Sequence, residues 1–262
     1  INMNINERVK REESAHTNKD VLGESVKLKN RFSHILTYPS LKRLSSAFEN
    51  SYLNSKSLTV LDYGCGKGED SLKMLKAGAR VYGIDISEKY INLSKELAIK
   101  NNFDQEDFTF EVMDGHNLKY ENNKFDLVIG NGILHHLDAE TALSSIHRVL
   151  KPGGRLIFRE PLADNPLLKL FRFLTPKART IDELPFSGKA LKKLTNPKNW
   201  DSEKMIYCGL LSAPIAIITS LILPKFPNNF LLKIADNLEC KLNKYQFFKP
   251  LNQYVLINLK KV

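Results

Sequence analysis

The sequence predicts an α/β fold with a doubly wound, seven-stranded, mostly parallel sheet. Five short apolar stretches follow one another along the first 160 residues, and each ends in a glycine or a polar residue. In a doubly wound sheet such ends gather at one edge, where ligands bind. Two further apolar stretches, at 204–210 and 253–259, bring the expected number of strands to seven.

The length of the chain bounds the number of domains. A chain of 262 residues with 42% hydrophobic content can build one full core, so we expect a single domain over 21–262. Residues 1–20 are rich in asparagine and lysine, and we expect them to form a flexible arm.

The first predicted strand, at 59–63, leads into a turn with glycines at positions 64, 66 and 68. Without a side chain, glycine lets the backbone turn sharply and lie against a ligand. The spacing differs from the G-x-G-x-x-G of dinucleotide sites, and no phosphate-binding Lys-Ser or Lys-Thr pair follows Gly66. A nicotinamide oxidoreductase is therefore disfavoured, although a ligand is expected at this turn.

The next two predicted strands, at 80–84 and 108–113, are each followed by an acid. Asp85 follows the earlier one and should lie beside the glycine turn, where a carboxylate can accept hydrogen bonds from two ribose hydroxyls. Asp114, which precedes Gly115, is placed to accept a hydrogen bond from the exocyclic amine of adenine. The two acids together predict a nucleoside ligand.

The fourth and fifth predicted strands, at 125–131 and 155–158, end near polar side chains that should face the same cavity. Gly130 and Asn131 close the fourth strand, and two histidines follow a few residues later. Arg159 and Glu160 stand at the tip of the fifth.

Taken in order, five motifs resemble those of the class I S-adenosylmethionine-dependent methyltransferases. They are VLDYGCGKG, VYGIDIS, the Met113-Asp114-Gly115 turn, FDLVIGNGILHHL and HRVLKPGGRLIF, and they cover about residues 57–160. The resemblance implies a Rossmann-like methyltransferase fold and S-adenosyl-L-methionine as the cofactor. A cation that carries a methyl group also suits acids and carbonyl dipoles better than a phosphate cradle.

The resemblance also implies roles for individual residues. Gly64 and Gly66 would approach the methionine end of the cofactor, with Asp62 behind them for its amino group, and Gly130 and Asn131 would offer backbone near the sulfonium.

The nucleoside would be held at the next two strand ends. Asp85 would bind the ribose, Ile86 would pack on the adenine, and Asp114 with Gly115 would hold the adenine edge.

Two segments are candidates to cover the acceptor. These are helices expected within 20–53 and the insert at 161–200 after the fifth strand, which is longer than an ordinary connection and is therefore expected to act as a lid. Asn165 as a cap and Pro166 in the first turn predict a short helix at its start. The side chains expected to bind the acceptor are Tyr38, Arg159, Arg172 and Arg179, although structural salt bridges are an alternative for each arginine.

A general base is needed only if the acceptor arrives protonated. The candidates are His135, His136 and Glu160, with His34 as a further one, and His135 is preferred because it follows the strand that carries Asn131. Packing histidines are the alternative interpretation. A carboxylate acceptor would need no base, only cations to orient it.

The charge of the chain is concentrated in its C-terminal half. The net charge is +10, and in residues 151–262 Lys and Arg outnumber Asp and Glu by 19 to 8. This excess is typical of a solvated surface, an anionic substrate, an anionic membrane surface or RNA. RNA is less favoured, because no aromatic side chains alternate with the basic ones.

An uncharged stretch at 205–223 has about the length of a membrane span. Gly209, Pro214 and several hydroxyls interrupt it, so a buried strand followed by a buried or surface-docking helix is favoured. The three widely spaced cysteines support neither a disulfide framework nor a metal site. We expect a cytoplasmic location, with peripheral membrane contact through the basic half as an alternative.

These observations favour a methyltransferase that acts on an oxygen or nitrogen of a small or lipid-like, anionic metabolite. A noncatalytic scaffold or binding subunit that retains the fold is the alternative, although such a subunit would have no physical need of the glycines and acids. An RNA methyltransferase is less favoured still. The acceptor and the oligomeric state stay open.

Overall fold

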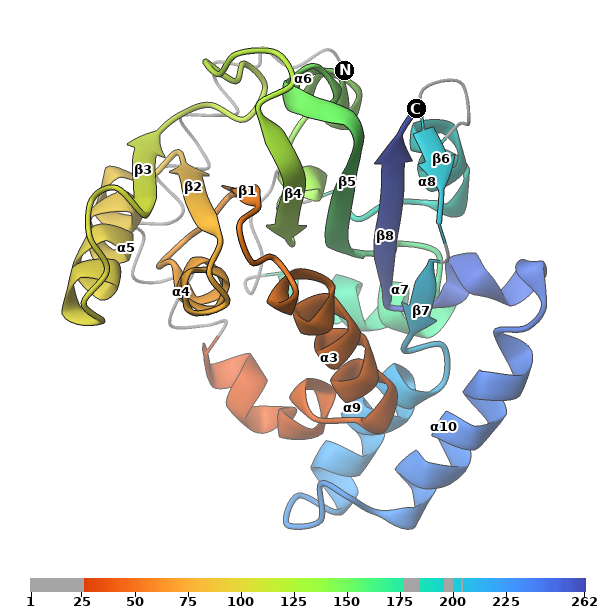
Figure 1. Ribbon diagram of the computed structural model, residues 1–262. Coiled ribbons are helices and arrows are strands. Elements are labelled where there is room, and N and C mark those ends of the chain that lie inside the picture. The colour runs from red at the N-terminus through yellow and green to blue at the C-terminus, as the bar shows by residue number, and fades with distance from the viewer. Residues whose placement is uncertain (1–25, 177–183, 196–199, 204) are drawn as a thin grey trace.

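The structure is a computed structural model that describes residues 26–176, 184–195, 200–203 and 205–262. The arm expected at 1–20 and the candidate Arg179 lie outside the described residues. Figure 1 shows a central sheet with helices around it. The strands are β1 (Thr59–Tyr63), β2 (Arg80–Asp85), β3 (Phe108–Val112), β4 (Phe125–Asn131), β5 (Leu150–Pro161), β6 (Trp200–Ser202), β7 (Ile206–Cys208) and β8 (Tyr254–Lys261).

The strand order confirms the doubly wound α/β prediction. It runs β3-β2-β1-β4-β5-β8-β6, with β1 to β5 parallel and β8 antiparallel to β5. The direction of winding reverses between β1 and β4, which lie side by side. Ligands bind at such a switch point, outside the carboxyl ends of the strands.

The sheet has eight strands, so the predicted number of seven was wrong by one. The eighth is β6, whose three residues are too few to show a pattern in the sequence. Ser202 pairs with Leu259, and after a short irregularity Ile206 pairs with Leu256, both on the outer side of β8. The eight strands therefore occupy seven positions, because β6 and β7 share the edge beyond β8.

Alternation along the strands builds a core on each face of the sheet. On β1, Val60 packs into one core and Leu61 into the other; on β4, Ile129 and Val128 divide in the same way. Neighbouring side chains of a strand point to opposite faces, so both layers are apolar. The core of Leu61 is covered by the helices at 139–149 and 188–194, and the core of Val60 by the helices at 39–53, 69–76, 88–100, 212–222 and 230–242.

Several of the helices begin at a residue whose side chain caps the first turn. The side chains of Ser87, Asp138, Asn165 and Asn229 accept hydrogen bonds from backbone N–H groups in the first turns of α5, α6, α7 and α10. The helices are α3 (Pro39–Leu53), α4 (Glu69–Lys76), α5 (Glu88–Lys100), α6 (Ala139–Val149), α7 (Pro166–Leu174), α8 (Gly188–Leu194), α9 (Ser212–Ile222) and α10 (Phe230–Leu242), with 3-10 turns η1 (Ser33–Leu36), η2 (Leu134–His136) and η4 (Gln246–Leu251).

The uncharged stretch at 205–223 forms β7 and then α9, as the favoured interpretation predicts. Among the described residues, no helix is both long enough and apolar enough to cross a bilayer. Figure 1 shows α9 and α10 lying side by side beneath the sheet, next to α3.

Candidate active site

The glycine turn after β1 adopts backbone angles that favour glycine. Gly64, Gly66 and Gly68 have φ values of 77°, 53° and 79°, and α4 begins at the next residue, Glu69. A Cβ atom on Gly64 would lie 2.7 Å from Cγ1 of Ile133, which follows β4. The turn therefore presents bare backbone at the switch point.

Asp85 ties the glycine turn to the end of β2. One carboxylate oxygen accepts a hydrogen bond from the Gly66 N–H at 3.0 Å, and the other accepts from the Ser87 N–H at 2.9 Å. Each carboxylate oxygen can accept a further bond. Asp85 thus lies beside the glycine turn, as predicted, and Ile86 next to it is half-buried.

Asp62 lies behind the turn rather than at its surface. Its side chain is buried and accepts a hydrogen bond from the Ser71 hydroxyl in α4 at 2.5 Å. The pKa of Asp62 is raised to about 7: burial is the largest cause, the hydrogen bond from Ser71 opposes it, and the nearby charges of Asp70 and Asp85 add to the rise. The carboxyl can therefore change its charge near neutral pH.

The Asp114 turn follows β3 and packs against β1. Asp114 accepts hydrogen bonds from the His116 N–H at 2.9 Å and from Nδ1 of the same residue at 2.7 Å. Nε2 of His116 accepts from the Asp138 N–H at 3.0 Å, which assigns the proton to Nδ1. A Cβ on Gly115 would lie 2.4 Å from the Tyr63 hydroxyl, so only glycine fits against β1 here.

Gly130 and Asn131, at the end of β4, contact side chains of β5. A Cβ on Gly130 would lie 2.1 Å from the Phe158 ring, which packs directly on the backbone. The Asn131 amide nitrogen donates to Asp70 of α4 at 3.4 Å, and its oxygen accepts from Arg159 Nε at 2.9 Å. Asn131 thus joins α4 to the tip of β5.

Glu160 is fully buried, which argues against its predicted role as a base that touches the acceptor. One of its oxygens accepts from the backbone N–H groups of Ile133 and Leu134 at 3.0 and 2.9 Å. The other lies 2.8 Å from Nδ1 of His135. Glu160 therefore fixes η2 and orients His135, and that histidine is itself buried, with its ring centre 4.1 Å from that of His136.

A cavity of about 600 Å³ adjoins these residues and is lined by His136 rather than by His135. Its walls come from segments far apart in the sequence, and its described lining carries three basic side chains and no acid. The lining residues are Leu28, Lys29, Ile35, Leu36, Leu41, Ser45, His136, Arg159, Pro161, Leu168, Phe171, Arg172, Pro185, Gln253 and Tyr254.

Two of the predicted acceptor-binding arginines line this cavity. Arg159 is held by Asn131 and by Ser45 Oγ, to which Nη1 donates at 3.0 Å, and its guanidinium lies 5.9 Å from the centre of the Phe48 ring. Arg172 donates to the carbonyls of residues 162 and 163 at 3.2 and 2.7 Å, so its side chain is held against the backbone.

Tyr38 does not line the cavity. It is fully buried, and its hydroxyl donates at 2.7 Å to Gln253, which does line it. Burial raises the pKa of Tyr38 well above its ordinary value, so the phenol stays neutral. His34 is likewise buried, against Thr219 and Ser220 of α9, so the structure gives both residues a place in the framework.

Sequence reasoning missed Lys29, Ser45 and Gln253. Each stands alone in its stretch of sequence, without a motif, and reaches the cavity only because the helical segment before η1, α3 and the residue before β8 come together there. Across the described part of the chain, no group of three His, Cys, Asp or Glu side chains is arranged to hold a metal ion.

The ends of β1 to β4 fit a cationic nucleoside. Gly64 and Gly66 are half-buried, Asp85 lies beside them, and the side chain of Asp114 is 36% exposed. The acids gather around the turn, whereas the basic side chains of the site lie in the cavity on the far side of Asn131.

Comparison with known proteins finds methyltransferases. A family model described as a methyltransferase domain matches residues 54–204, more than half of the chain. A 27-O-demethylrifamycin SV methyltransferase of Amycolatopsis mediterranei is 39% identical over 99 residues, covering 37% of this chain and 36% of that relative. A 2-phytyl-1,4-naphtoquinone methyltransferase of Nostoc punctiforme is 34% identical over 123 residues, covering 44% and 52%. The match thus covers less than two thirds of either relative.

Solved structures share the fold. The geranyl diphosphate C-methyltransferase of Streptomyces coelicolor A3(2), crystallised with Mg²⁺, geranyl diphosphate and S-adenosyl-L-homocysteine, aligns with a TM-score of 0.59. The alignment covers 85% of this chain and 82% of that one at 16% identity. At this identity the likeness concerns the fold alone.

Proposed function

Since the chain belongs to the class I S-adenosylmethionine-dependent methyltransferases, we propose that it methylates a hydroxyl oxygen of an amphipathic, anionic small molecule. The cavity carries this proposal: apolar side chains make up most of its lining, and the charged ones are all basic. An acceptor with an apolar body and an acidic group matches that combination.

The residues at the strand ends would hold the cofactor. Asp85 would accept hydrogen bonds from the ribose hydroxyls, Asp114 would take the adenine amine, and the backbone at Gly64 and Gly66 would approach the methionine portion. S-adenosylmethionine supplies an electrophilic methyl group on a sulfonium sulfur. Transfer is an in-line displacement, so holding the acceptor oxygen in line with methyl and sulfur provides much of the rate.

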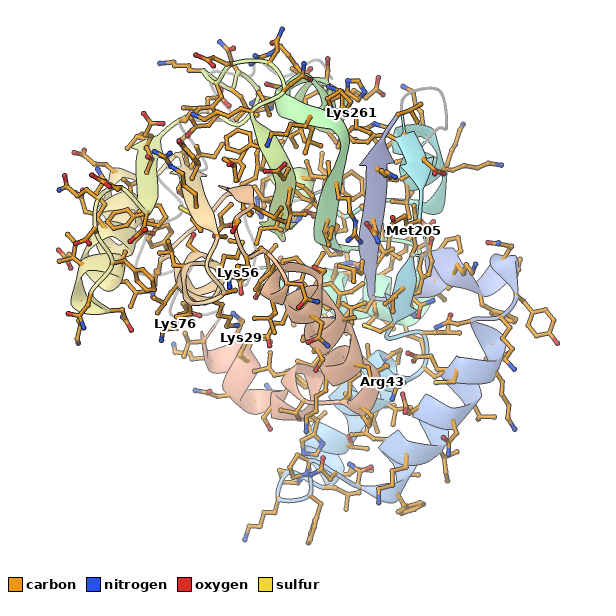
Figure 2. The ribbon with its side chains drawn as sticks, viewed as in Figure 1. Lys29, Arg43, Lys56, Lys76, Met205 and Lys261 are labelled. Atoms are coloured by element: carbon orange, nitrogen blue, oxygen red, sulfur yellow. The ribbon has the colours of Figure 1, made fainter. Side chains whose placement is uncertain are left out.

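Arg159 is the side chain best placed to orient the acceptor. Its guanidinium lines the cavity, and Asn131 and Ser45 fix its direction. A positioned guanidinium forms short, charge-assisted hydrogen bonds with an acidic group. Lys29, which is labelled in Figure 2, and Arg172 add positive charge to the same cavity.

His136 is the histidine that would accept the proton of the hydroxyl. It lines the cavity, whereas His135 is held behind it by Glu160. The sequence favoured His135 as the base, whereas the burial of His135 favours His136 instead. His136 would take the proton of the hydroxyl as the acceptor oxygen receives the methyl group, and S-adenosylhomocysteine would be the other product.

The two relatives support an apolar acceptor. Their names specify a demethylrifamycin and a phytyl-naphthoquinone, both of which have extended apolar portions. The cavity offers apolar side chains that would pack against such a body, among them Leu168 and Phe171 of α7 and Leu41 of α3.

The proposal is tested by the formation of S-adenosylhomocysteine with two matched acceptors, a hydroxynaphthoate and its uncharged carboxamide. We expect turnover of the acid, with kcat/KM at least about tenfold higher than for the amide, because one charge-assisted hydrogen bond is lost. Equal turnover of the two would exclude an anionic acceptor.

A histidine pair tests the proton acceptor. His136→Gln should lower kcat on the hydroxynaphthoate roughly 100-fold while leaving cofactor affinity unchanged. The matched control is His147→Gln on α6, where the ring packs against Trp200 with centres 5.0 Å apart. Cofactor binding without product for any acceptor would favour the noncatalytic binding subunit instead.

A further inference from the structure

The two helices after β7 expose apolar side chains at one end of the molecule. Figure 1 shows the turn between α9 and α10 projecting away from the sheet. Each helix carries an exposed stripe at helical spacing, and the turn adds one aromatic residue. The seven side chains, between 47% and 65% exposed, are Ile218, Leu221, Ile222, Phe226, Phe230, Ile234 and Leu238, and we call them the α9–α10 apolar surface.

The opposite faces of both helices pack into the core of the protein. Ala213 and Ala216 of α9 and Leu232 of α10 pack into the same core cluster, so the exposed stripes turn away from it. Where the stripes meet, residues 223 and 225–230 surround a hollow of about 420 Å³. Contiguous apolar patches of this kind mark interaction sites in folded proteins.

Between residues 209 and 251, the exposed charged side chains are all positive. Within residues 209–251 the two acids face inward: Glu239 is buried and accepts from the backbone N–H groups of residues 209, 211 and 212, and Asp236 pairs with Arg43 at 2.6 Å. The exposed charged side chains of the same range are Lys225, Lys233, Lys241 and Lys244.

We propose that the α9–α10 apolar surface docks on an anionic lipid surface. Apolar side chains that project between lysines suit the boundary between lipid headgroups and acyl chains, where lysines attract anionic phosphates. A second copy of the chain fits less well. An isologous dimer would bring Lys225 and Lys233 of the two copies face to face, and like charges repel.

The 3-10 turn η1 connects α9 to the lining of the acceptor cavity. His34 of η1 donates its backbone N–H to Ser220 of α9 at 3.0 Å, and the next two residues, Ile35 and Leu36, line the cavity. Docking therefore brings the cavity near the bilayer, where an apolar acceptor concentrates. That consequence rests on the proposed function, whereas docking itself does not.

Flotation with lipid vesicles tests the proposal on the full chain. We expect binding to an equimolar mixture of phosphatidylglycerol and phosphatidylcholine, weakened by salt, and little binding to phosphatidylcholine alone. Phe226→Ser with Phe230→Ser should weaken the partition roughly 100-fold, since two aromatic side chains no longer enter the lipid. Lys225→Glu with Lys233→Glu should weaken it roughly 30-fold or more.

The matched control is Ile99→Ser with Lys100→Glu on α5. Ile99 is 56% exposed and Lys100 is exposed, yet α5 packs on β2 and β3 at the other end of the sheet, so lipid binding should be unchanged. Failure of the native chain to bind the mixed vesicles would overturn the proposal, as would an equal loss in the α5 variant. A concentration-dependent dimer that disappears in the phenylalanine variant, without lipid binding, would assign the surface to self-association and overturn it too.

Two further measurements keep the variants interpretable. Thermal unfolding separates lost docking from lost folding. Titration with S-adenosylmethionine should give the native affinity in every variant, because none of the changed residues lies near the glycine turn. A chain that binds lipid but not cofactor would sustain the docking proposal while removing the proposed function, and the reverse result would remove only docking.

Discussion

The two sides of the active site carry opposite charge. The side proposed to hold the cofactor, here called the cofactor side, gathers carboxylates, with Asp62 behind the glycine turn, Asp85 beside it and Asp114 after β3. The described lining of the acceptor cavity carries basic side chains and no acid. A cationic cofactor and an anionic acceptor would therefore each meet the charge that stabilises it, and exchanging their places would be unfavourable on both sides.

Asn131 joins the two sides. Asn131 donates to Asp70 with its amide nitrogen and accepts from Arg159 with its oxygen. A neutral amide can satisfy an acid and a base at once, because it has both a donor and an acceptor. A substitution on either side should therefore weaken the binding of one ligand and leave the binding of the other unchanged.

The largest expected effect is on the cofactor side. Asp85→Ala removes the carboxylate proposed to accept from two ribose hydroxyls, and S-adenosylmethionine should bind roughly 100-fold more weakly or worse, because each charged hydrogen bond contributes about 1.5 kcal/mol or more. Isothermal titration calorimetry measures this.

The control for Asp85 is Asp104→Ala, which removes an exposed acid between α5 and β3 and should leave affinity unchanged. Because Asp85 also accepts from the Gly66 N–H, thermal unfolding must show that the variant is folded. A folded variant that binds the cofactor within threefold of the native chain would contradict the cofactor assignment.

A smaller effect is expected on the acceptor side. Arg159→Met should raise KM for an anionic acceptor roughly 10- to 100-fold, the range for losing one charge-assisted hydrogen bond, while the affinity for S-adenosylmethionine stays within about twofold. Steady-state kinetics and calorimetry on the same preparation measure both quantities.

Arg155→Met is the matched control, because Arg155 lies on the same strand but pairs with Glu203 at 2.9 Å, outside the cavity. Surface pairs of this kind contribute little to stability, so this variant should behave as the native chain does. If both arginine variants raised KM equally, or if Arg159→Met weakened cofactor binding instead, the division of charge between the two sides would be wrong.

The cofactor side could be predicted from the sequence because it is built from consecutive residues. Each of the acids and glycines stands within a few residues of a strand end, and in a parallel sheet those ends meet at one edge. Local rules also predicted the cap of α7, where Asn165 accepts from two N–H groups of the first turn.

The acceptor side could not be predicted in the same way. Lys29, Ser45 and Gln253 reach the cavity only after three distant elements pack together. The position of Glu160 was predicted, but its role was not: full burial and three backbone donors follow from η2 folding over it, and no local pattern shows that. For the same reason, sequence could not tell which of the two adjacent histidines lines the cavity.

The smallest effect concerns pH and Asp62. Burial raises the pKa of this carboxyl to about 7, so the folded state favours its protonated form between its ordinary pKa and neutrality. A cofactor that carries positive charge beside Asp62 favours the ionised form and releases a proton on binding. The affinity for S-adenosylmethionine should therefore fall as pH drops below 7, by at most about tenfold per pH unit, and level off above 7.

Asp62→Asn keeps the shape and hydrogen-bonding capacity but cannot ionise, so its affinity should be weaker at pH 8 and nearly flat between pH 5 and pH 8. The stability effect has the opposite sign. The neutral carboxyl contributes stability below its ordinary pKa, and this contribution is lost as pH rises through about 7. The free native chain should thus lose stability relative to Asp62→Asn over that interval. A pH dependence of cofactor affinity that survives in Asp62→Asn would assign it to another group and leave Asp62 a purely structural partner of Ser71.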